Sequence, residues 1–327
     1  MQKLVANFSN QLREAVVIGS ATNFQTPKTP LHNVVIAGLG GSGIGGDIVR
    51  EITSLNCKLP VVVTKGYFVP DFVNDNTLFI ASSYSGNTEE TLQALEMAIE
   101  RKAKIVCITS GGKVLALAQQ HQLDHVVIPG GFPPRSCLGY SITQLLFIFK
   151  FFGLINMDVA QDIAAAADLL DQEEENIHQL GHAITASLKG KSPIIYSTTY
   201  FEAVAIRFRQ QLNENAKMLC WHNVIPEMNH NELVGWRSKN DDLAVILFRD
   251  PNEYSRNDLR IEINKNVIKN YTSTFIEIMA KGKNHLEKAM YLIHIGDWIS
   301  CYLADQRGFN ATEIDVINNL KSALSKA

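Results

Sequence analysis

Gly38-Leu39-Gly40-Gly41-Ser42-Gly43-Ile44-Gly45-Gly46 contains six glycines in nine residues. It follows Val34-Val35-Ile36-Ala37, which predicts a β-strand, and it leads into a helix expected from about Ser42 to Leu55. Glycines at such a junction permit positive φ and let backbone N–H groups approach a ligand closely. The N-terminus of the next helix adds unpaired donors and partial positive charge. This strand-to-helix turn is therefore predicted to bind an anion.

The same alternation of strand and helix extends on both sides of the glycine run. In the first half, strands are expected near Pro60–Thr64, Thr77–Ser82, Ala103–Thr109 and His125–Ile128, with helices near Asn87–Lys102 and Gly139–Phe152. An alanine- and glutamate-rich segment, Met157–Leu188, predicts one long helix. The alternation then restarts, with strands near Pro193–Ser197, Leu243–Phe248 and Thr274–Ile278 and helices near Tyr200–Leu219, Ser255–Lys269, Asn284–Ala304 and Glu313–Ser325.

This order of elements predicts an α/β fold of two domains, each a parallel sheet flanked by helices. A length of 327 residues, about twice that of a typical domain, agrees with two. The expected boundaries are 1–155 for the first domain, 156–190 for a helical linker and 191–327 for the second domain. Only the first half has a glycine-rich loop, so we expect one half to hold a phosphate and the other to supply catalytic groups.

The composition bounds the class of partner and the compartment. A formal net charge of −3 gives no global field for nucleic acid or an anionic membrane. The N-terminus lacks a signal-peptide pattern, and no apolar run reaches about 18 residues. The five cysteines are scattered without metal-ligand spacing, so we expect buried free thiols, no metal and a reducing, cytoplasmic setting: Cys57, Cys107, Cys137, Cys220, Cys301.

A second cluster of hydroxyls marks another strand-to-helix junction, at Ser82-Ser83-Tyr84-Ser85-Gly86-Asn87-Thr88-Glu89-Glu90-Thr91. Ser and Thr start helices routinely, so the alternative interpretation is an N-cap. One or two hydroxyls would satisfy a cap, and this cluster exceeds that need. It is therefore predicted to bind phosphate together with the glycine run.

The glycine run also matches the dinucleotide pattern Gly38-x-Gly40-x-x-Gly43. That interpretation needs an acidic residue after the next strand, to bind the ribose hydroxyls. Here the strand ends in Thr64-Lys65-Gly66. This disfavours NAD, whereas Lys65 leaves NADP open, and we expect no cofactor.

Together, Gly40-Gly41-Ser42-Gly43, Ser83-Tyr84-Ser85-Gly86-Asn87-Thr88, Asn213-Glu214-Asn215 and Asn229-His230-Asn231-Glu232 resemble the bifunctional phosphoglucose/phosphomannose isomerase family. Its members consist of two sugar-isomerase (SIS) domains, and the resemblance runs from about residue 33 to the C-terminal helix. It implies that the 6-phosphate is held by Gly41, Ser42, Ser83, Ser85 and Thr88.

Aldose–ketose isomerisation needs a base that removes a proton α to a carbonyl and returns it to the neighbouring carbon through an enediol. The resemblance assigns this role to Glu214, which the flanking amides of Asn213 and Asn215 can orient. It assigns opening of the sugar ring to His230, a residue that titrates near neutral pH. His222 has no counterpart in the family pattern and is expected to be structural.

Three further site residues follow from the resemblance. Arg135 would stabilise the negative charge of the enediolate. Lys321, on the last helix, would assist ring opening. Many relatives carry Asp-Pro-Thr-Pro before that helix, whereas this chain has Asn310-Ala311-Thr312-Glu313. Thr312 would occupy the threonine position and give the space in which the substrate rotates about C2–C3. Both prolines are missing, so the sequence supports glucose activity more strongly than mannose activity.

The sequence thus predicts a cytoplasmic isomerase of fructose, glucose and mannose 6-phosphates, with roles in glycolysis and gluconeogenesis. The resemblance implies a homodimer with the active site at the subunit interface, where His230 comes from the partner subunit. The alternative is a regulator that binds sugar phosphates without catalysis. Such proteins usually need an output module, and no helix-turn-helix extension or basic face is evident.

Overall fold

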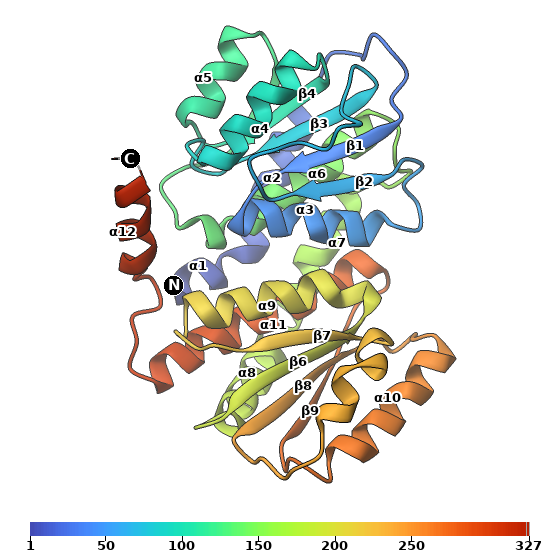
Figure 1. The fold of residues 1–327 in the computed structure, drawn as a ribbon, viewed down its shortest axis with the longest axis vertical. Helices are drawn as coiled ribbons and strands as arrows, with labels where there is room; N and C mark the ends of the chain where they lie inside the picture. Colours follow the sequence, from blue (N-terminus) through green and yellow to red (C-terminus); the bar gives the residue numbers. More distant parts are fainter. Residues whose placement is uncertain (325, 327) are drawn as a thin grey trace. The chain divides into compact units, whose positions relative to one another are not determined.

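The computed structural model describes residues 1–324 and 326, and all elements given below belong to this part. Contacts divide the chain into two compact units. The N-terminal unit comprises 6–171 and 282–287, and the C-terminal unit comprises 1–5, 172–281 and 288–327. Both are α/β units built on parallel sheets, as the alternation of elements predicts (Figure 1).

The N-terminal unit contains a five-stranded parallel sheet of order β2-β1-β3-β4-β5. Side chains alternate between its two faces because successive Cβ atoms of a strand point in opposite directions. Val35 and Phe79 pack with helices on one face, while both faces are buried, as in other parallel sheets. The strands are β1 (Asn33–Ala37), β2 (Val61–Thr64), β3 (Thr77–Ser82), β4 (Lys104–Thr109) and β5 (Asp124–Val127).

Helices cover both faces of this sheet (Figure 1). On the Val35 face, Ala94, Leu95 and Ala118 of two helices complete one apolar cluster. On the opposite face, Ile36 lies against the helix that follows the glycine run. The helices of this unit are α2 (Phe8–Ala21), α3 (Gly40–Thr53), α4 (Glu89–Glu100), α5 (Gly112–Gln120), η1 (Pro134–Ser136), α6 (Leu138–Phe151) and α7 (Val159–Gln172).

The C-terminal unit contains a four-stranded parallel sheet of order β7-β6-β8-β9. One apolar cluster covers a sheet face with Ile261 and Ile268, and Phe208 packs on Phe248 with ring centroids 5.9 Å apart. The strands are β6 (Ser192–Thr198), β7 (Trp221–Ile225), β8 (Leu243–Arg249) and β9 (Phe275–Met279). The helices are α1 (Gln2–Ala6), α8 (Glu174–Ser187), η2 (Thr199–Phe201), α9 (Glu202–Glu214), η3 (Glu227–His230), η4 (Glu232–Gly235), α10 (Ser255–Ile268), α11 (His285–Gln306) and α12 (Asp315–Leu324).

Several expected elements differ from the observed ones. The single long helix expected over Met157–Leu188 is wrong: two helices, α7 and α8, meet at Glu173, whose carboxylate accepts hydrogen bonds from Lys281 and Asn176. The helix expected to reach Leu219 ends at Glu214. Helix α5 and the edge strand β7 were not expected, because glycines precede α5 and polar residues interrupt β7.

Neither a membrane-spanning segment nor a disulfide is found in the described chain. None of the helices within residues 1–324 is both long and apolar enough to cross a bilayer. All five cysteines are free, and Cys57 and Cys220 are only partly buried, whereas the other three are buried. Among residues 1–324 and 326, no three His, Cys, Asp or Glu side chains gather closely enough to hold a metal ion.

Candidate active site

The glycine run and the serine-rich run follow adjacent strands of the N-terminal sheet. Strand β1 leads into α3 and strand β3 leads through residues 83–88 into α4. Because β1 and β3 are parallel neighbours, their carboxyl ends lie at the same edge of the sheet. The chain order changes direction between these two strands, and parallel α/β sheets bind ligands at such a point. The two predicted phosphate-binding runs therefore lie at one switch point, at the carboxyl ends of β1 and β3.

Glycine is required where the first run turns. A Cβ on Gly38 would lie 2.7 Å from the Ser82 carbonyl oxygen, and one on Gly43 would overlap the Gly38 carbonyl. The run is helical from Gly40, two residues earlier than expected. Ser42 lies in the first turn of α3, and its amide donates to the carbonyl of Leu39, the N-cap residue, at 3.1 Å. This placement suits an anion at the helix N-terminus.

In the second run, Thr88 is the N-cap residue of α4, yet its side chain makes no capping hydrogen bond. Its Oγ1 instead accepts a hydrogen bond of 3.1 Å from the Ser83 hydroxyl. Ser85 is exposed, and its Oγ accepts from the Asn87 amide at 3.3 Å. Gly86 has φ +67° and lies against Gly111, where a Cβ would overlap the carbonyl oxygen. The N-cap interpretation therefore does not account for this cluster of hydroxyls.

Two contacts join these runs to each other and to the predicted arginine. The Tyr84 amide donates a 3.2 Å hydrogen bond to Ser42 Oγ. A Cβ on Gly41 would lie 2.9 Å from the Pro134 carbonyl oxygen and 3.5 Å from Arg135 Cα. Arg135 itself is 3% exposed. The structure thus brings Gly41, Ser42, Ser83, Thr88 and Arg135 into one neighbourhood.

Tyr84 supports this neighbourhood and was not expected as a site residue. Its hydroxyl accepts from the Phe132 amide at 3.1 Å, and its carbonyl accepts from the Ser110 hydroxyl at 2.6 Å. Burial, followed by a hydrogen bond with Cys137, raises the pKa of the Tyr84 phenol. Burial also raises the pKa of the Cys137 thiol. Both groups therefore stay neutral near pH 7, and the position of Tyr84 inside the serine-rich run was the available signal.

Lys65, which left NADP open, is paired within its own unit. Its Nζ forms an ion pair with Asp47 of α3, a residue only 6% exposed. Asp47 also lies 3.5 Å from Arg50. The ammonium that a 2′-phosphate would require is therefore engaged by a carboxylate of the chain, which disfavours the dinucleotide alternative.

In the C-terminal unit, Glu214 is the last residue of α9 and is half-buried. Two buried contacts fix α9 on α11. Arg207 donates to the Asp297 carboxylate at 3.0 and 3.2 Å, and Asn215 donates to the Ser300 hydroxyl at 2.9 Å. Breaking a buried ion pair by removing one partner typically costs about 3–5 kcal/mol. Glu214 is therefore held at the end of a firmly anchored helix.

The Thr312 segment lies against the residues that follow Glu214. Lys217 Nζ donates to the carbonyl oxygens of Glu214, Asn310 and Glu313, at 2.6, 3.2 and 2.7 Å. Thr312 is exposed, and both its amide and its hydroxyl donate to the Asn310 side chain. The structure thus joins the backbone at Glu214 to the segment that carries Thr312, and no local pattern in the sequence marks Lys217.

His230 and Lys321 lie exposed on separate elements. His230 ends η3, and Lys321 lies on α12. His222, expected to be structural, sits on β7 with its Nδ1 3.3 Å from an Arg209 guanidinium nitrogen. Burial, and then the charge of Arg209, lower the pKa of His222. The ring is therefore neutral near pH 7, with Nδ1 as the acceptor, which agrees with a structural role.

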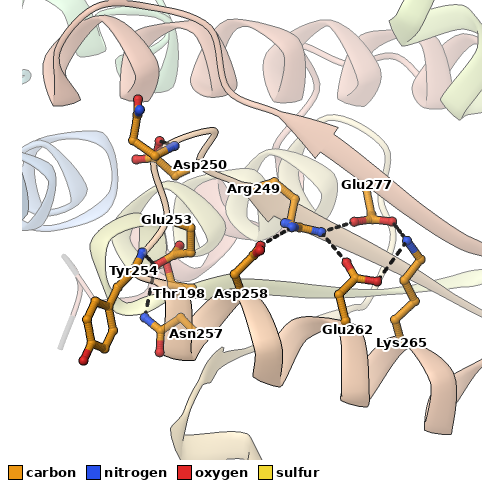
Figure 2. Close-up of polar contacts among 11 residues, drawn as sticks. Thr198, Arg249, Asp250, Glu253, Tyr254, Asn257, Asp258, Glu262, Lys265 and Glu277 are labelled. Carbon is orange, nitrogen blue, oxygen red and sulfur yellow. Dashed lines mark hydrogen bonds and ion pairs between the residues drawn. The ribbon is translucent and has the colours of Figure 1, made fainter.

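The corresponding point of the C-terminal sheet, between the carboxyl ends of β6 and β8, carries carboxylates (Figure 2). The Thr198 hydroxyl donates to Glu253 at 2.9 Å, and Lys288 donates to Asp250 at 2.6 Å. Glu253 also accepts from the Tyr254 amide at 3.0 Å. Beside them, Arg249 contacts three carboxylates and Lys265 contacts two of the same three: Asp258, Glu262, Glu277.

Comparison with known proteins matches both halves of the chain to sugar-isomerase families. Residues 30–129 match the SIS domain, and residues 177–324 match the bacterial phospho-glucose isomerase C-terminal SIS domain. The bifunctional phosphoglucose/phosphomannose isomerase of Caldicellulosiruptor bescii is 36% identical over 100% of this chain and 99% of its own length. That of Thermoplasma acidophilum is 38% identical over 90% of each chain.

Solved structures show the same fold. Tagatose-6-phosphate ketose/aldose isomerase from Escherichia coli superposes with a TM-score of 0.73 over 95% of this chain and 93% of its own. Its sequence identity of 15% supports the fold alone. The full-length sequence matches go further, and the chain belongs to the bifunctional phosphoglucose/phosphomannose isomerase family.

Proposed function

We propose that this protein is an isomerase that interconverts fructose 6-phosphate with glucose 6-phosphate and mannose 6-phosphate. The observation that carries the proposal is the joining of the glycine-rich and serine-rich runs by the Tyr84–Ser42 hydrogen bond, next to Arg135. Family membership supports the same reaction, because full-length relatives carry both activities in their names. A phosphate bound there would accept hydrogen bonds from hydroxyls and helix-terminal amides.

The reaction moves one hydrogen between adjacent carbons. In open-chain glucose 6-phosphate, Glu214 would remove the proton from C2, forming a cis-enediol, and return it to C1. The O2 proton is lost as C2 becomes a carbonyl, and O1 gains one as the aldehyde becomes a hydroxyl. What supports Glu214 is its place at the end of α9, held by the Arg207–Asp297 and Asn215–Ser300 contacts.

The remaining roles follow the family assignment. Arg135 would stabilise the enediolate, and its burial supports this, since a charge removed from water acts more strongly. His230 and Lys321 would open the sugar ring. Thr312 would leave room for rotation about C2–C3, which mannose 6-phosphate requires.

We further propose a cytoplasmic homodimer with the active site at the subunit interface, in which His230 acts across the dimer. The exposure of His230 in its own chain supports a role toward a partner subunit. We keep the domain boundaries at 1–155 and 191–327, with a helical linker over 156–190. The isomerase would serve glycolysis and gluconeogenesis and would need no metal or cofactor.

The proposal is tested by incubating EDTA-treated protein with fructose 6-phosphate and measuring each aldose 6-phosphate separately. Formation of both products is the expected result. Glucose 6-phosphate alone would keep the mechanism and remove the mannose activity. Folded protein that binds fructose 6-phosphate yet forms neither product would favour the non-catalytic regulator, and strict dependence on added metal would contradict the mechanism.

A further inference from the structure

Lys217 connects separate backbone segments beside the proposed base, Glu214. It lies three residues after Glu214, and its side chain is 22% exposed. The ammonium group carries three donors. The structure gives it three backbone carbonyl acceptors, those of Glu214, Asn310 and Glu313. Two of these acceptors lie more than 90 residues away in the sequence, so the contact joins distant segments.

The backbone at Lys217 is held in an unfavourable conformation. Its φ is +53°, in the left-handed region that residues other than glycine and asparagine rarely adopt. Such a conformation persists only where surrounding contacts determine it. The Glu313 carboxylate, 3.8 Å from Nζ, lies beside the ammonium and balances its charge. The three carbonyl acceptors and the Glu313 carboxylate explain why a lysine occupies a position where glycine would have a less strained backbone.

The segment that Lys217 contacts, residues 310–313, forms a small turn with Thr312 near its apex. Asn310 Oδ1 accepts from both the Thr312 amide and the Thr312 hydroxyl, at 2.9 and 2.7 Å. The Glu313 amide donates to the Asn310 carbonyl at 3.3 Å. A further hydrogen bond connects the end of α11 to the residues after Glu214: Arg307 Nε donates to the Ala216 carbonyl at 3.1 Å. No proline stiffens residues 310–313, so these hydrogen bonds set the position of the turn.

We propose that Lys217 is a positioning residue, which sets the rate of proton transfer and the ratio of glucose to mannose products by fixing Thr312 relative to Glu214. This inference rests on the proposed function, since Glu214 and Thr312 act there on the substrate. The physical reason is that proton transfer depends steeply on geometry, and a displacement of about 1 Å can cost about 100-fold in rate. Choice between the two aldoses depends on the space beside C2–C3, which the Thr312 turn borders in this scheme.

The test compares Lys217→Met, Lys217→Gly and Lys217→Arg with the wild type. Methionine removes the donors and keeps the backbone strain, whereas glycine removes the donors and also relieves the strain. Arginine keeps a multidentate donor. Lys102→Met is the matched control, because Lys102 is an exposed lysine with φ +61°. For each variant, kcat and KM for fructose 6-phosphate and the ratio of the two products are measured, with thermal unfolding recorded in parallel.

We expect kcat to fall about 10- to 100-fold in both the Met and the Gly variants, with KM changed little. The product ratio should shift in the same two variants, and arginine should restore part of the rate. Lys102→Met should match the wild type. Loss of the ammonium that leaves kcat and the product ratio unchanged in a folded Gly variant would overturn the inference. So would a kcat that the strain-relieving glycine restores fully.

The same experiment separates this inference from the proposed function. Wild-type protein that forms no aldose 6-phosphate would remove the isomerase itself. Active wild type with an unaltered Lys217→Gly variant would remove only the role of Lys217. A variant that loses thermal stability in proportion to its loss of kcat, at an unchanged product ratio, would assign Lys217 to stability alone and would contradict the proposal.

Discussion

The two halves of this protein use one topology with opposite chemistry. In the N-terminal sheet, β1 lies between β2 and β3, and in the C-terminal sheet β6 lies between β7 and β8. At the first of these points the chain supplies glycines, hydroxyls and helix amides. At the second it supplies Asp250 and Glu253 (Figure 2). These carboxylates accept hydrogen bonds from Lys288 and Thr198, respectively. The topology gives each sheet a switch point, and the side chains decide which of the two suits a phosphate.

Charge explains why the switch point of the C-terminal sheet does not suit an anion. The Thr198 hydroxyl and the Lys288 ammonium are both engaged by carboxylates of the chain. Lys288 also donates to the Asn252 side chain at 3.0 Å. A phosphate there would displace these partners and meet like charges, which repel at short range. We therefore expect one sugar-phosphate site in each chain, at the glycine-rich and serine-rich runs that follow β1 and β3.

The largest effect is expected at Glu214. Changing Glu214→Gln removes the group that moves the proton and keeps the shape of the side chain. We expect kcat for fructose 6-phosphate to fall at least about 100-fold, since positioned acid–base groups contribute about 10²–10⁴-fold. Binding of fructose 6-phosphate should persist. Glu202→Gln, at the other end of α9, is the control and should remain active. Comparable turnover in the two variants would remove Glu214 as the base.

A smaller effect, on KM for fructose 6-phosphate, should distinguish the switch points of the two sheets. Ser83→Ala removes a hydroxyl of the proposed phosphate site, and Thr198→Val removes the hydroxyl at the matching place in the C-terminal sheet. Hydrogen bonds to charged groups contribute about 1.5–3 kcal/mol, so Ser83→Ala should raise KM for fructose 6-phosphate about 10- to 100-fold. Thr198→Val should leave KM unchanged. Steady-state kinetics checks both, and the opposite pattern would place the phosphate at the switch point of the C-terminal sheet.

The sequence predicted the fold best where local signals agree. Strand β3, Thr77–Ser82, has the predicted bounds because an apolar run ends at a cluster of serines. The end of α9 was missed because the left-handed backbone at Lys217 stops the helix, and no glycine or proline marks that position. Strand β7 was missed because it lies at the edge of its sheet, where Trp221, His222 and Asn223 break the apolar pattern.

In the candidate site, too, residues in local motifs could be predicted from the sequence, whereas contacts between separate elements could not. Ser42, Ser83 and Thr88 could be predicted as candidate phosphate ligands because glycines and hydroxyls at strand-to-helix junctions form a local motif. Lys217 could not be predicted, because its acceptors at Asn310 and Glu313 are distant in the sequence. The Asp47 partner of Lys65 also escaped prediction, because the two residues lie on different elements, and this ion pair disfavours the dinucleotide alternative.

The smallest predicted effect concerns stability of the carboxylate-rich region. Burial acts to raise the pKa of Glu277, but its ion pairs with Lys265 and Arg249 outweigh burial and lower the pKa from its ordinary 4.5. The folded pKa lies below the unfolded one, so the stabilisation is present above about pH 4.5 and is lost as pH falls through the folded value. Glu277→Gln should therefore cost about 1–3 kcal/mol of unfolding free energy at pH 7.

Denaturant unfolding at several pH values measures this cost. The difference between wild type and Glu277→Gln should shrink as the pH falls below about 4.5. Asp258→Asn is the control, because the Asp258 side chain is 51% exposed and should contribute less than about 1 kcal/mol. A difference that stays constant between pH 7 and pH 3 would show that the Glu277 charge does not stabilise this region.

Calorimetric titration of fructose 6-phosphate into the Glu214→Gln variant measures how many sugar phosphates each chain binds and where, because loss of the base slows turnover. We expect one sugar phosphate bound per chain, with affinity retained when Thr198→Val is added and weakened at least about tenfold when Ser83→Ala is added. Two sugar phosphates per chain, or affinity that depends on Thr198 and not on Ser83, would contradict this expectation.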